Sequence, residues 1–381
     1  MREQRHRILC VANCRIADML AKGNVWYVRH FEAHFDRVFV VYEFGRSPRF
    51  LVRGRTALIS LGTGLGTLCD LLWSPVSLYR AVRRLAPGVV LTGDQVFSFW
   101  TLALVRLLLR RKVALIPVCI PDEIHRSTGR GTTGLPIWLE NLFIALTRRT
   151  IDLVISQRSA DVRPWIESKS GFRNIIRVDT WPDALPSSSF LAAAGMLKQA
   201  ARPSGGGDFR MIFVGRLHAE KHVEDLLHMM RELRDLPAAA LTIVGDGPRR
   251  AELERLCAEL GVERSVAFAG AVPNDRLPAL YAEAALYVST VTGTSLREAA
   301  LCGLPIVSYA IPWVANTFSD GVNALIVPFG DHRALAAAVR RVMRDEPLRL
   351  ALAKGAGALA RELWSTERLA PALAAVERAL S

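Results

Sequence analysis

Two short segments combine glycine with basic or hydroxyl side chains where a predicted strand leads into a predicted helix. The first reads VGRLHAEK and places Arg216 and Lys221 shortly after Gly215. A helix start attracts anions, because its N–H groups are free and it carries a partial positive charge. Two added cations would suit a diphosphate. Because surface arginine and lysine are common, a solvated loop is the alternative.

The second segment, TGTSLRE at residues 292–298, also begins a predicted helix. Gly293 lets the backbone approach a ligand closely, and the N–H groups around it would face phosphate. Glu298 would accept hydrogen bonds from sugar hydroxyls. The S-x-x-E spacing of Ser295 and Glu298 is also that of a capping box, in which Glu298 only caps its own helix. Gly245, in a GDGP turn, is a further residue that could shape a ligand pocket.

The first half of the chain offers acid–base candidates in one predicted loop. Asp122, Glu123 and His125 follow a predicted strand, and they are equally well explained as polar loop residues. Cys10 and Cys14 have no second cysteine pair nearby, so we interpret them as buried small hydrophobes and predict no metal site. The chain has 6 scattered cysteines, which fits a reducing compartment.

Short apolar runs alternate with amphipathic helical patterns along the chain, a pattern typical of parallel sheets covered by helices on both faces. The expected fold class is therefore α/β, with two Rossmann-like parallel-sheet domains facing a cleft. Ligands bind at strand ends in such sheets. The predicted strands are 7–12, 38–42, 57–61, 89–92, 113–119, 153–156, 209–214, 238–244, 266–268, 286–288, 306–307 and 325–327.

A connector separates the two expected domains. Residues 191–207 end in PSGGG, a composition that favours a flexible linker. We therefore expect one domain at 1–190 and a second at 208–364. A final Ala- and Leu-rich helix is predicted within 365–381.

Composition and charge exclude several classes of protein. The chain has 381 residues, of which 51% are hydrophobic and 22% charged, which suits two domains with cores and excludes a disordered chain. A net charge of +13 favours an anionic partner. The basic residues are spread along the chain without a recognised nucleic-acid motif, so nucleic acid is not expected. No apolar run reaches about 18 residues, so we predict no membrane-spanning helix and a cytoplasmic location.

In order and spacing, five segments of the second half resemble the retaining family-4 glycosyltransferases (glycosyl transferases group 1), which have the GT-B fold. The resemblance covers roughly residues 209–369, and the first half shares only the general α/β layout. It implies transfer of a sugar from a nucleotide-diphosphate sugar to an acceptor hydroxyl, with retention at the anomeric carbon. The segments are VGRLHAEK at 214–221, LTIVGDGP at 241–248, VAFAGAVPNDRLPALYAEA at 266–284, TGTSLREAALCGLPIV at 292–307 and DGVNALIVPFGD at 320–331.

The resemblance assigns roles to individual residues. Arg216 and Lys221 match the pair that neutralises the donor diphosphate, so the resemblance implies neither a metal nor a cofactor. Glu298 matches the acid that binds the donor ribose. Position 290 normally carries an acid that contacts the donor sugar, and Thr290 stands there instead, which leaves the identity of the sugar open. The remaining expected donor-binding residues are Gly215, Gly245, Gly293, Thr294, Ser295 and Leu296.

The resemblance also implies a division of labour between the domains. Residues 1–190 would bind the acceptor and residues 208–364 the nucleotide sugar, with the helix in 365–381 packing back on the first domain. The family has a histidine on the acceptor side. His125 is the candidate for it, and Asp122 and Glu123 are the alternatives.

The expected function is a metal-independent glycosyltransferase of the hexosyltransferase type in cell-surface polysaccharide or glycolipid synthesis. Its expected partners are a UDP- or GDP-linked sugar and a sugar, glycolipid or polyprenyl-linked acceptor. Basic residues between 106 and 149 adjoin aromatic ones, which favours peripheral docking on the anionic inner face of a membrane. Solvated helix faces are the alternative. The alternative function is a non-catalytic nucleotide-sugar-binding or partner-binding subunit with a decayed site. Thr290 and the lack of a clearly placed acceptor-side histidine favour this alternative, and the intact Arg216, Lys221 and Glu298 oppose it.

Overall fold

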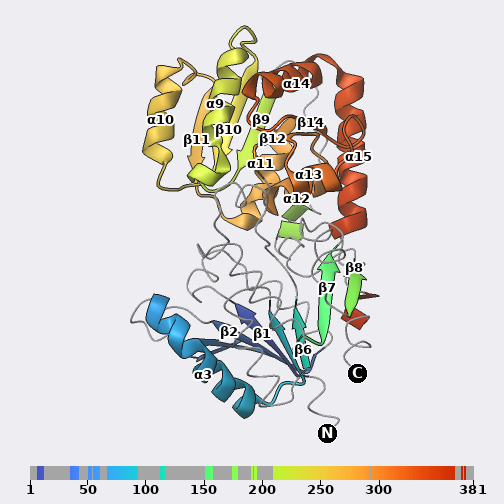
Figure 1. The fold of residues 1–381 in the computed structure, drawn as a ribbon. Helices are drawn as coiled ribbons and strands as arrows, with labels where there is room; N and C mark the ends of the chain where they lie inside the picture. Colours follow the sequence, from blue (N-terminus) through green and yellow to red (C-terminus); the bar gives the residue numbers. More distant parts are fainter. Residues whose placement is uncertain are drawn as a thin grey trace. The chain divides into compact units, whose positions relative to one another are not determined.

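The computed structural model divides the chain into two compact units, which are described separately here (Figure 1). Unit 1 comprises Met1–Asp183 and Thr366–Ser381, and unit 2 comprises Ala184–Ser365. This division falls a few residues before the linker predicted at 191–207. The structure describes residues 7–12, 35–42, 50–53, 55–60, 67–92, 112–115, 151–157, 174–178, 190–191, 193–194, 209–291, 294–364, 370–371 and 373–374.

The described part of unit 1 contains an 8-stranded sheet in the order β3-β4-β2-β1-β5-β6-β7-β8. Neighbouring strands are parallel, except that β3 runs antiparallel to β4 at one edge. The strands are β1 (Arg7–Ala12), β2 (Arg37–Tyr42), β3 (Phe50–Arg53), β4 (Thr56–Ser60), β5 (Val89–Thr92), β6 (Lys112–Leu115), β7 (Leu153–Gln157) and β8 (Ile175–Val178).

Helix α3 (Thr67–Leu85) covers the centre of this sheet. Leu78 and Val82, one helical turn apart, pack with Leu9 of β1 and Val90 of β5 in a buried cluster. Cys10 is buried and unpaired, and burial raises the pKa of its thiol to about 12. The interpretation of Cys10 as a small core residue is therefore confirmed, whereas Cys14 lies outside the described residues.

Unit 2 is built on a 6-stranded parallel sheet in the order β11-β10-β9-β12-β13-β14. The chain first moves outward from β9 to β11 and then returns to lay β12 on the other side of β9. The order therefore reverses between β9 and β12, and in open α/β sheets such a switch point is where ligands bind. The strands are β9 (Phe209–Val214), β10 (Ala239–Val244), β11 (Val266–Gly270), β12 (Leu286–Ser289), β13 (Ile306–Tyr309) and β14 (Leu325–Val327).

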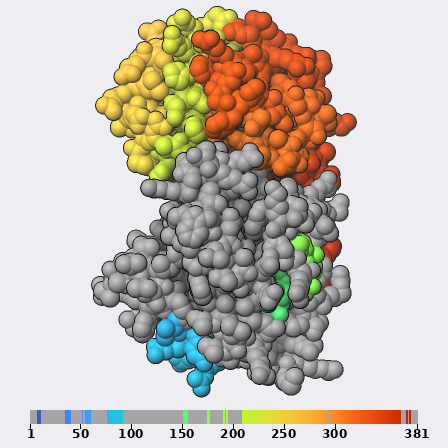
Figure 2. Space-filling view, in the orientation of Figure 1, coloured from blue at the N-terminus to red at the C-terminus, as the bar shows by residue number. Residues whose placement is uncertain are grey.

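Helices flank both faces of this sheet, because right-handed crossovers leave β9 and β12 in opposite directions. On one face α9 packs beside α10 and α14, and elsewhere α12 packs against α15 (Figure 1). In the view of Figure 2 the yellow-green segment of unit 2 lies between the yellow and the orange-to-red segments. The helices are α9 (Val223–Glu232), α10 (Arg250–Glu259), α11 (Leu277–Glu283), α12 (Thr294–Leu301), α13 (Pro312–Thr317), α14 (His332–Arg344) and α15 (Glu346–Trp364).

The apolar pattern of each helix explains which side it buries. Helix α9 buries Val223, Leu226, Leu227 and Met230, which recur at helical spacing. Arg340 of α14 donates to both carboxylate oxygens of Asp235, just beyond the end of α9, at 2.5 and 2.7 Å. This exposed ion pair ties the two neighbouring helices together.

The α/β fold class predicted from the sequence is confirmed, and most predicted strands lie within two residues of the observed ones. Two strands, β3 and β8, and the helices α13, α14 and α15 were not predicted. The sequence predicted a purely parallel sheet in unit 1. This is wrong at one edge of the sheet, where β3 runs antiparallel to β4. None of the described helices is long and apolar enough to cross a membrane.

Candidate functional site

The loop after β9 carries the two cations that the sequence singled out. It runs from Gly215 to a short 3₁₀ turn, η3 (Ala219–Lys221), and helix α9 begins only at Val223. Arg216 is exposed, and its Nη2 donates to Glu220 Oε1 at 2.6 Å. Because this pair is solvated, it stabilises the loop only slightly and leaves the guanidinium able to change partner.

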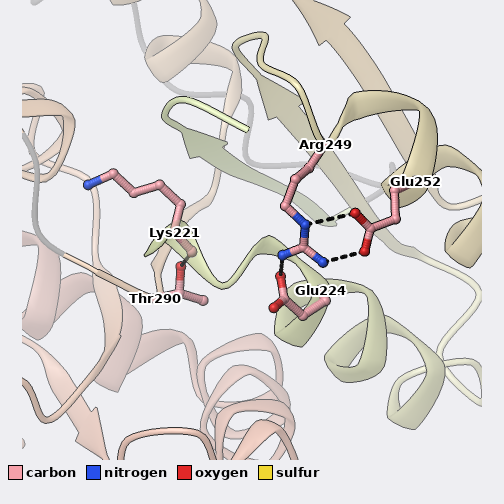
Figure 3. A network of polar contacts seen from close by, with 5 residues as sticks. All are labelled: Lys221, Glu224, Arg249, Glu252 and Thr290. Carbon is pink, nitrogen blue, oxygen red and sulfur yellow. Dashed lines mark hydrogen bonds and ion pairs between the residues drawn. The ribbon is translucent and has the colours of Figure 1, made fainter. Parts of the chain in front are cut away.

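Lys221 is the more buried of the two cations. Burial lowers the pKa of its ammonium, the negative charge of Glu220 raises it, and the nearby Arg216 lowers it again. An anionic phosphate placed beside this ammonium would stabilise its positive charge and so offset the cost of desolvation. In Figure 3 the Lys221 side chain points away from the other four labelled residues.

The backbone around Lys221 is held on several sides. The N–H of Lys221 donates to the carbonyl of His218 at 2.9 Å. The carbonyl of Lys221 accepts a hydrogen bond from Thr290 Oγ1 at 2.5 Å (Figure 3). His222, the next residue, has φ 46° and ψ 43°, a left-handed conformation that residues other than glycine rarely adopt. The ring of Phe329 lies edge-on to His222, at 5.1 Å between centroids.

Two glycines allow the loops after β9 and β10 to touch backbone to backbone. Gly245 has φ +136°, and a Cβ atom there would lie 1.9 Å from the carbonyl oxygen of Gly215. A Cβ at Gly247 would lie 2.4 Å from the carbonyl oxygen of Leu217. The N–H of Leu217 donates to the carbonyl of Asp246 at 3.0 Å, so the two loops form one connected surface.

Arg249 braces this surface from the β10 side. Its guanidinium forms a two-point ion pair with Glu252, at 2.6 and 3.0 Å, and donates to Glu224 of α9 at 2.8 Å (Figure 3). Both hydrogen-bonded glutamates raise the pKa of Arg249. With its charge balanced by two carboxylates, Arg249 acts as a brace between α9 and α10.

Glu298 is a buried carboxyl on the neighbouring helix α12, with only 3% of its surface exposed. Asn274 Nδ2 donates to its Oε1 at 2.9 Å, and the Tyr281 hydroxyl donates to its Oε2 at 3.3 Å. Burial raises the pKa of Glu298, and these two hydrogen bonds lower it. Each oxygen still has lone pairs available to a further donor, such as a ligand hydroxyl.

The capping-box interpretation of Ser295 and Glu298 is not supported by their contacts. Ser295 Oγ donates to the carbonyl of Val214 at 2.7 Å and accepts from the Tyr287 hydroxyl at 2.9 Å. Ser295 thus links the start of α12 to the end of β9. Glu298 is bound by Asn274 and Tyr281 instead, so its burial has a reason beyond capping.

The structure therefore places Gly215, Arg216 and Lys221 at the carboxyl end of β9, and Thr290 and Glu298 beyond the carboxyl end of β12. These strands are neighbours at the switch point of the sheet. A pair of cations on one side and a hydrogen-bonded carboxylate on the other can bind a ligand that has both phosphate and hydroxyl groups.

Other predicted residues are placed less informatively. Thr294 is exposed at the start of α12, whereas Leu296 is fully buried and packs in the core. Gly293, Asp122 and His125 lie outside the described residues, as do the basic residues between 106 and 149 other than Lys112, which begins β6. Within the described part of the chain, no group of three or more His, Cys, Asp or Glu could hold a metal ion.

Three residues of the site were missed by the sequence reasoning. Asn274 and Tyr281, which hold Glu298, lie in the segment at 266–284, but their spacing to Glu298 carries no local signal. Arg249 follows the GDGP turn directly, and an arginine three residues before Glu252 is a recognisable pairing.

One family model matches the part of the chain that carries this site. Residues 198–358 match the family model described as Glycosyl transferases group 1. This match covers less than half of the chain, and it confirms the resemblance to the glycosyl transferases group 1 that the sequence indicated for this region.

Curated relatives agree with this assignment. A 2-deoxystreptamine glucosyltransferase of Streptomyces kanamyceticus is 32% identical over 213 residues, 53% of this chain and 55% of that protein. A 2-deoxystreptamine N-acetyl-D-glucosaminyltransferase of Streptomyces fradiae is 28% identical over 52% of this chain and 46% of that protein. The matched region thus spans about half the length of these curated relatives.

Solved structures support the fold over nearly the whole chain. A sucrose-phosphate synthase from Thermosynechococcus elongatus has a TM-score of 0.76 at 17% identity and covers 98% of this chain and 99% of its own. Anabaena HepE in complex with UDP-glucose has a TM-score of 0.69 at 18% identity and covers 98% and 99% of the two chains. The fold is therefore that of the GT-B glycosyltransferases.

Proposed function

We propose that this protein is a glycosyltransferase that moves a sugar from a nucleotide-diphosphate sugar to an acceptor hydroxyl with retention. The observation that carries the proposal is the pairing of the Arg216–Lys221 loop with buried Glu298 at the switch point between β9 and β12. The match of residues 198–358 to the glycosyl transferases group 1 supports the reaction class. HepE, of the same fold, was solved with UDP-glucose, which supports a nucleotide sugar as donor.

In this proposal the two cations and the carboxylate bind different parts of the donor. Lys221 and Arg216 neutralise the diphosphate, most strongly when the sugar departs and negative charge develops on the leaving phosphate. Partial burial strengthens the attraction at Lys221, because water screens it less. Glu298 accepts hydrogen bonds from the ribose hydroxyls, with its carboxylate oriented by Asn274 and Tyr281.

The proposed reaction requires no metal, since the two cations Arg216 and Lys221 supply the charge that a divalent ion would otherwise provide. The proposed acceptors are a sugar, a glycolipid or a polyprenyl-linked sugar in cell-surface polysaccharide or glycolipid synthesis. The proposed location is cytoplasmic, with peripheral attachment to the inner face of the membrane.

The test measures binding and slow hydrolysis of UDP-, GDP- and ADP-sugars by the full chain in the presence of EDTA. We expect one donor to bind and release its sugar. Lys221→Ala should weaken that binding roughly 10- to 150-fold, the equivalent of about 1.5–3 kcal/mol for a hydrogen bond to a charged group. Lys354→Ala, the same change at an exposed site on α15, is the matched control and should have no effect.

Two outcomes would contradict the proposal in different ways. If none of the donors binds the wild-type chain, the transferase function is refuted. If one donor binds with dependence on Lys221, but neither hydrolysis nor transfer to any acceptor class occurs, the result favours a non-catalytic nucleotide-sugar-binding subunit.

A further inference from the structure

Thr290 makes a contact that the sequence did not predict. Its side chain is fully buried, and its Oγ1 donates to the backbone carbonyl of Lys221 across 69 positions of sequence. Thr290 directly follows β12, and Lys221 lies in the loop after β9, so the bond joins the two strand ends at the switch point (Figure 3).

The bond completes the hydrogen bonding of the Lys221 backbone. Its N–H is bound by the carbonyl of His218, and its carbonyl is bound by Thr290. His222, immediately after, is held in the left-handed conformation, so the chain turns sharply where Lys221 ends. Because its N–H and its carbonyl are both bound, the backbone of Lys221 is held in place, and so is the Cα–Cβ bond from which its side chain extends. The left-handed turn at His222 is unfavourable for a non-glycine residue and needs contacts to hold it.

A second anchor holds the start of α9 without acting on Lys221 itself. Glu224, in the first turn of α9, is bound by Arg249, which is in turn fixed by Glu252 (Figure 3). Thr290 is therefore the described contact that ties the Lys221 carbonyl to β12, while Arg249 ties α9 to α10.

The chemistry of position 290 explains why a hydroxyl stands there. A carbonyl oxygen needs a donor, and threonine supplies an O–H, whereas an ionised carboxylate has no proton to donate and would repel the carbonyl. With its single proton given to Lys221, the Thr290 hydroxyl has none left to donate to a sugar hydroxyl.

We propose that Thr290 is a positioning residue for Lys221: its hydrogen bond to the Lys221 carbonyl aims the ammonium at the donor diphosphate. This inference rests on the proposed function and deepens it. It replaces the expectation that Thr290 contacts the donor sugar directly, and it assigns the substitution at this position to the phosphate side of the site.

The test compares binding of UDP with binding of uridine, its nucleoside without phosphates, by calorimetry on the full chain. Thr290→Val removes the hydroxyl and keeps the shape, whereas Thr290→Ser keeps the hydroxyl. We expect Thr290→Val to weaken UDP binding roughly 2- to 12-fold, as for the loss of one hydrogen bond between neutral groups, with uridine binding unchanged. Thr290→Ser should restore UDP binding. GDP with guanosine and ADP with adenosine serve if UDP does not bind.

The same measurement in the Lys221→Ala background separates positioning from direct contact. If Thr290 acts through Lys221, Thr290→Val has no further effect there, because the ammonium it aims is already gone. The inference would be overturned if the Thr290→Val variant bound UDP with wild-type affinity. It would also be overturned if Thr290→Val weakened UDP binding equally in the wild-type and Lys221→Ala proteins, or if it weakened uridine binding as much as UDP binding. Failure of the wild-type chain to bind any of the three diphosphates would refute the proposed function instead.

Discussion

The close approach of Gly245 to the backbone of Gly215 predicts that one added methyl group at Gly245 lowers the stability of the fold. Gly245→Ala places a Cβ 1.9 Å from the carbonyl oxygen of Gly215, which is the residue that begins the Arg216–Lys221 loop. Gly261→Ala is the matched control. Gly261 also has a positive φ, of +68°, but nothing lies within 4 Å of an added Cβ there.

The magnitude follows from two separate costs. Placing alanine at a positive φ costs about 1–2 kcal/mol, and both variants incur a cost of this kind. Gly245→Ala adds a clash with backbone atoms, which cannot rotate away, and forced overpacking typically costs about 1–3 kcal/mol. At roughly 2–4 °C per kcal/mol for a unit of this size, Gly245→Ala should melt about 2–12 °C below Gly261→Ala.

The assay is thermal unfolding of the full chain followed by circular dichroism, with UDP binding measured on the same samples below the transition. Because the clash pushes Gly215 out of place, Gly245→Ala should also weaken UDP binding, and Gly261→Ala should not. Equal melting temperatures for the two variants would refute the reasoning that the two loops need direct backbone contact.

Three further predictions concern the charges of the site. Burial lowers the pKa of Lys221, so its ammonium should lose its proton at a pH below the ordinary lysine pKa of about 10.4. UDP binding, measured by calorimetry, should therefore fall as the pH rises through that lowered pKa. An equal fall in the Lys221→Arg variant would contradict this prediction. The raised pKa of Glu298 means that its ionisation lowers the stability of the fold as pH rises from about 4.5 through that pKa. The unfolding free energy of Glu298→Gln relative to wild type should therefore increase between pH 4 and pH 8 in urea titrations, and a constant difference would contradict this. Glu224→Gln should lower the free energy of unfolding by about 1–2 kcal/mol, and Glu252→Gln by less than about 1 kcal/mol, because Glu252 is more exposed to water. Equal losses in urea unfolding would show that partial burial does not decide the strength of these ion pairs.

Local sequence was sufficient wherever structure depends on neighbouring residues. The apolar run at Phe209–Val214 became β9, and the helical spacing of Val223, Leu226 and Met230 became the buried side of α9. The edge strand β3 was missed, because a four-residue strand at an edge carries little periodic signal.

In the candidate site too, the sequence revealed the residues with a local signal and missed those that depend on distant contacts. Gly215, Arg216, Lys221 and Glu298 were found because glycine, basic and acidic residues after predicted strands are visible in the sequence. The interpretation of Glu298 stayed open between a helix cap and a ligand contact. Its partners Asn274 and Tyr281 lie 24 and 17 residues away, on other elements, and no local spacing reports them.

The sequence by itself determined the α/β class, the family resemblance and the residues that carry charge in unit 2, since these depend on residue type and local order. Only the tertiary structure decided that β12 returns to lie beside β9 and thereby brings Thr290 to the carbonyl of Lys221. The physical reason is that strand order in a parallel sheet is set by the packing of whole helices and strands. Contacts between residues 69 positions apart in sequence exist only once that packing has formed.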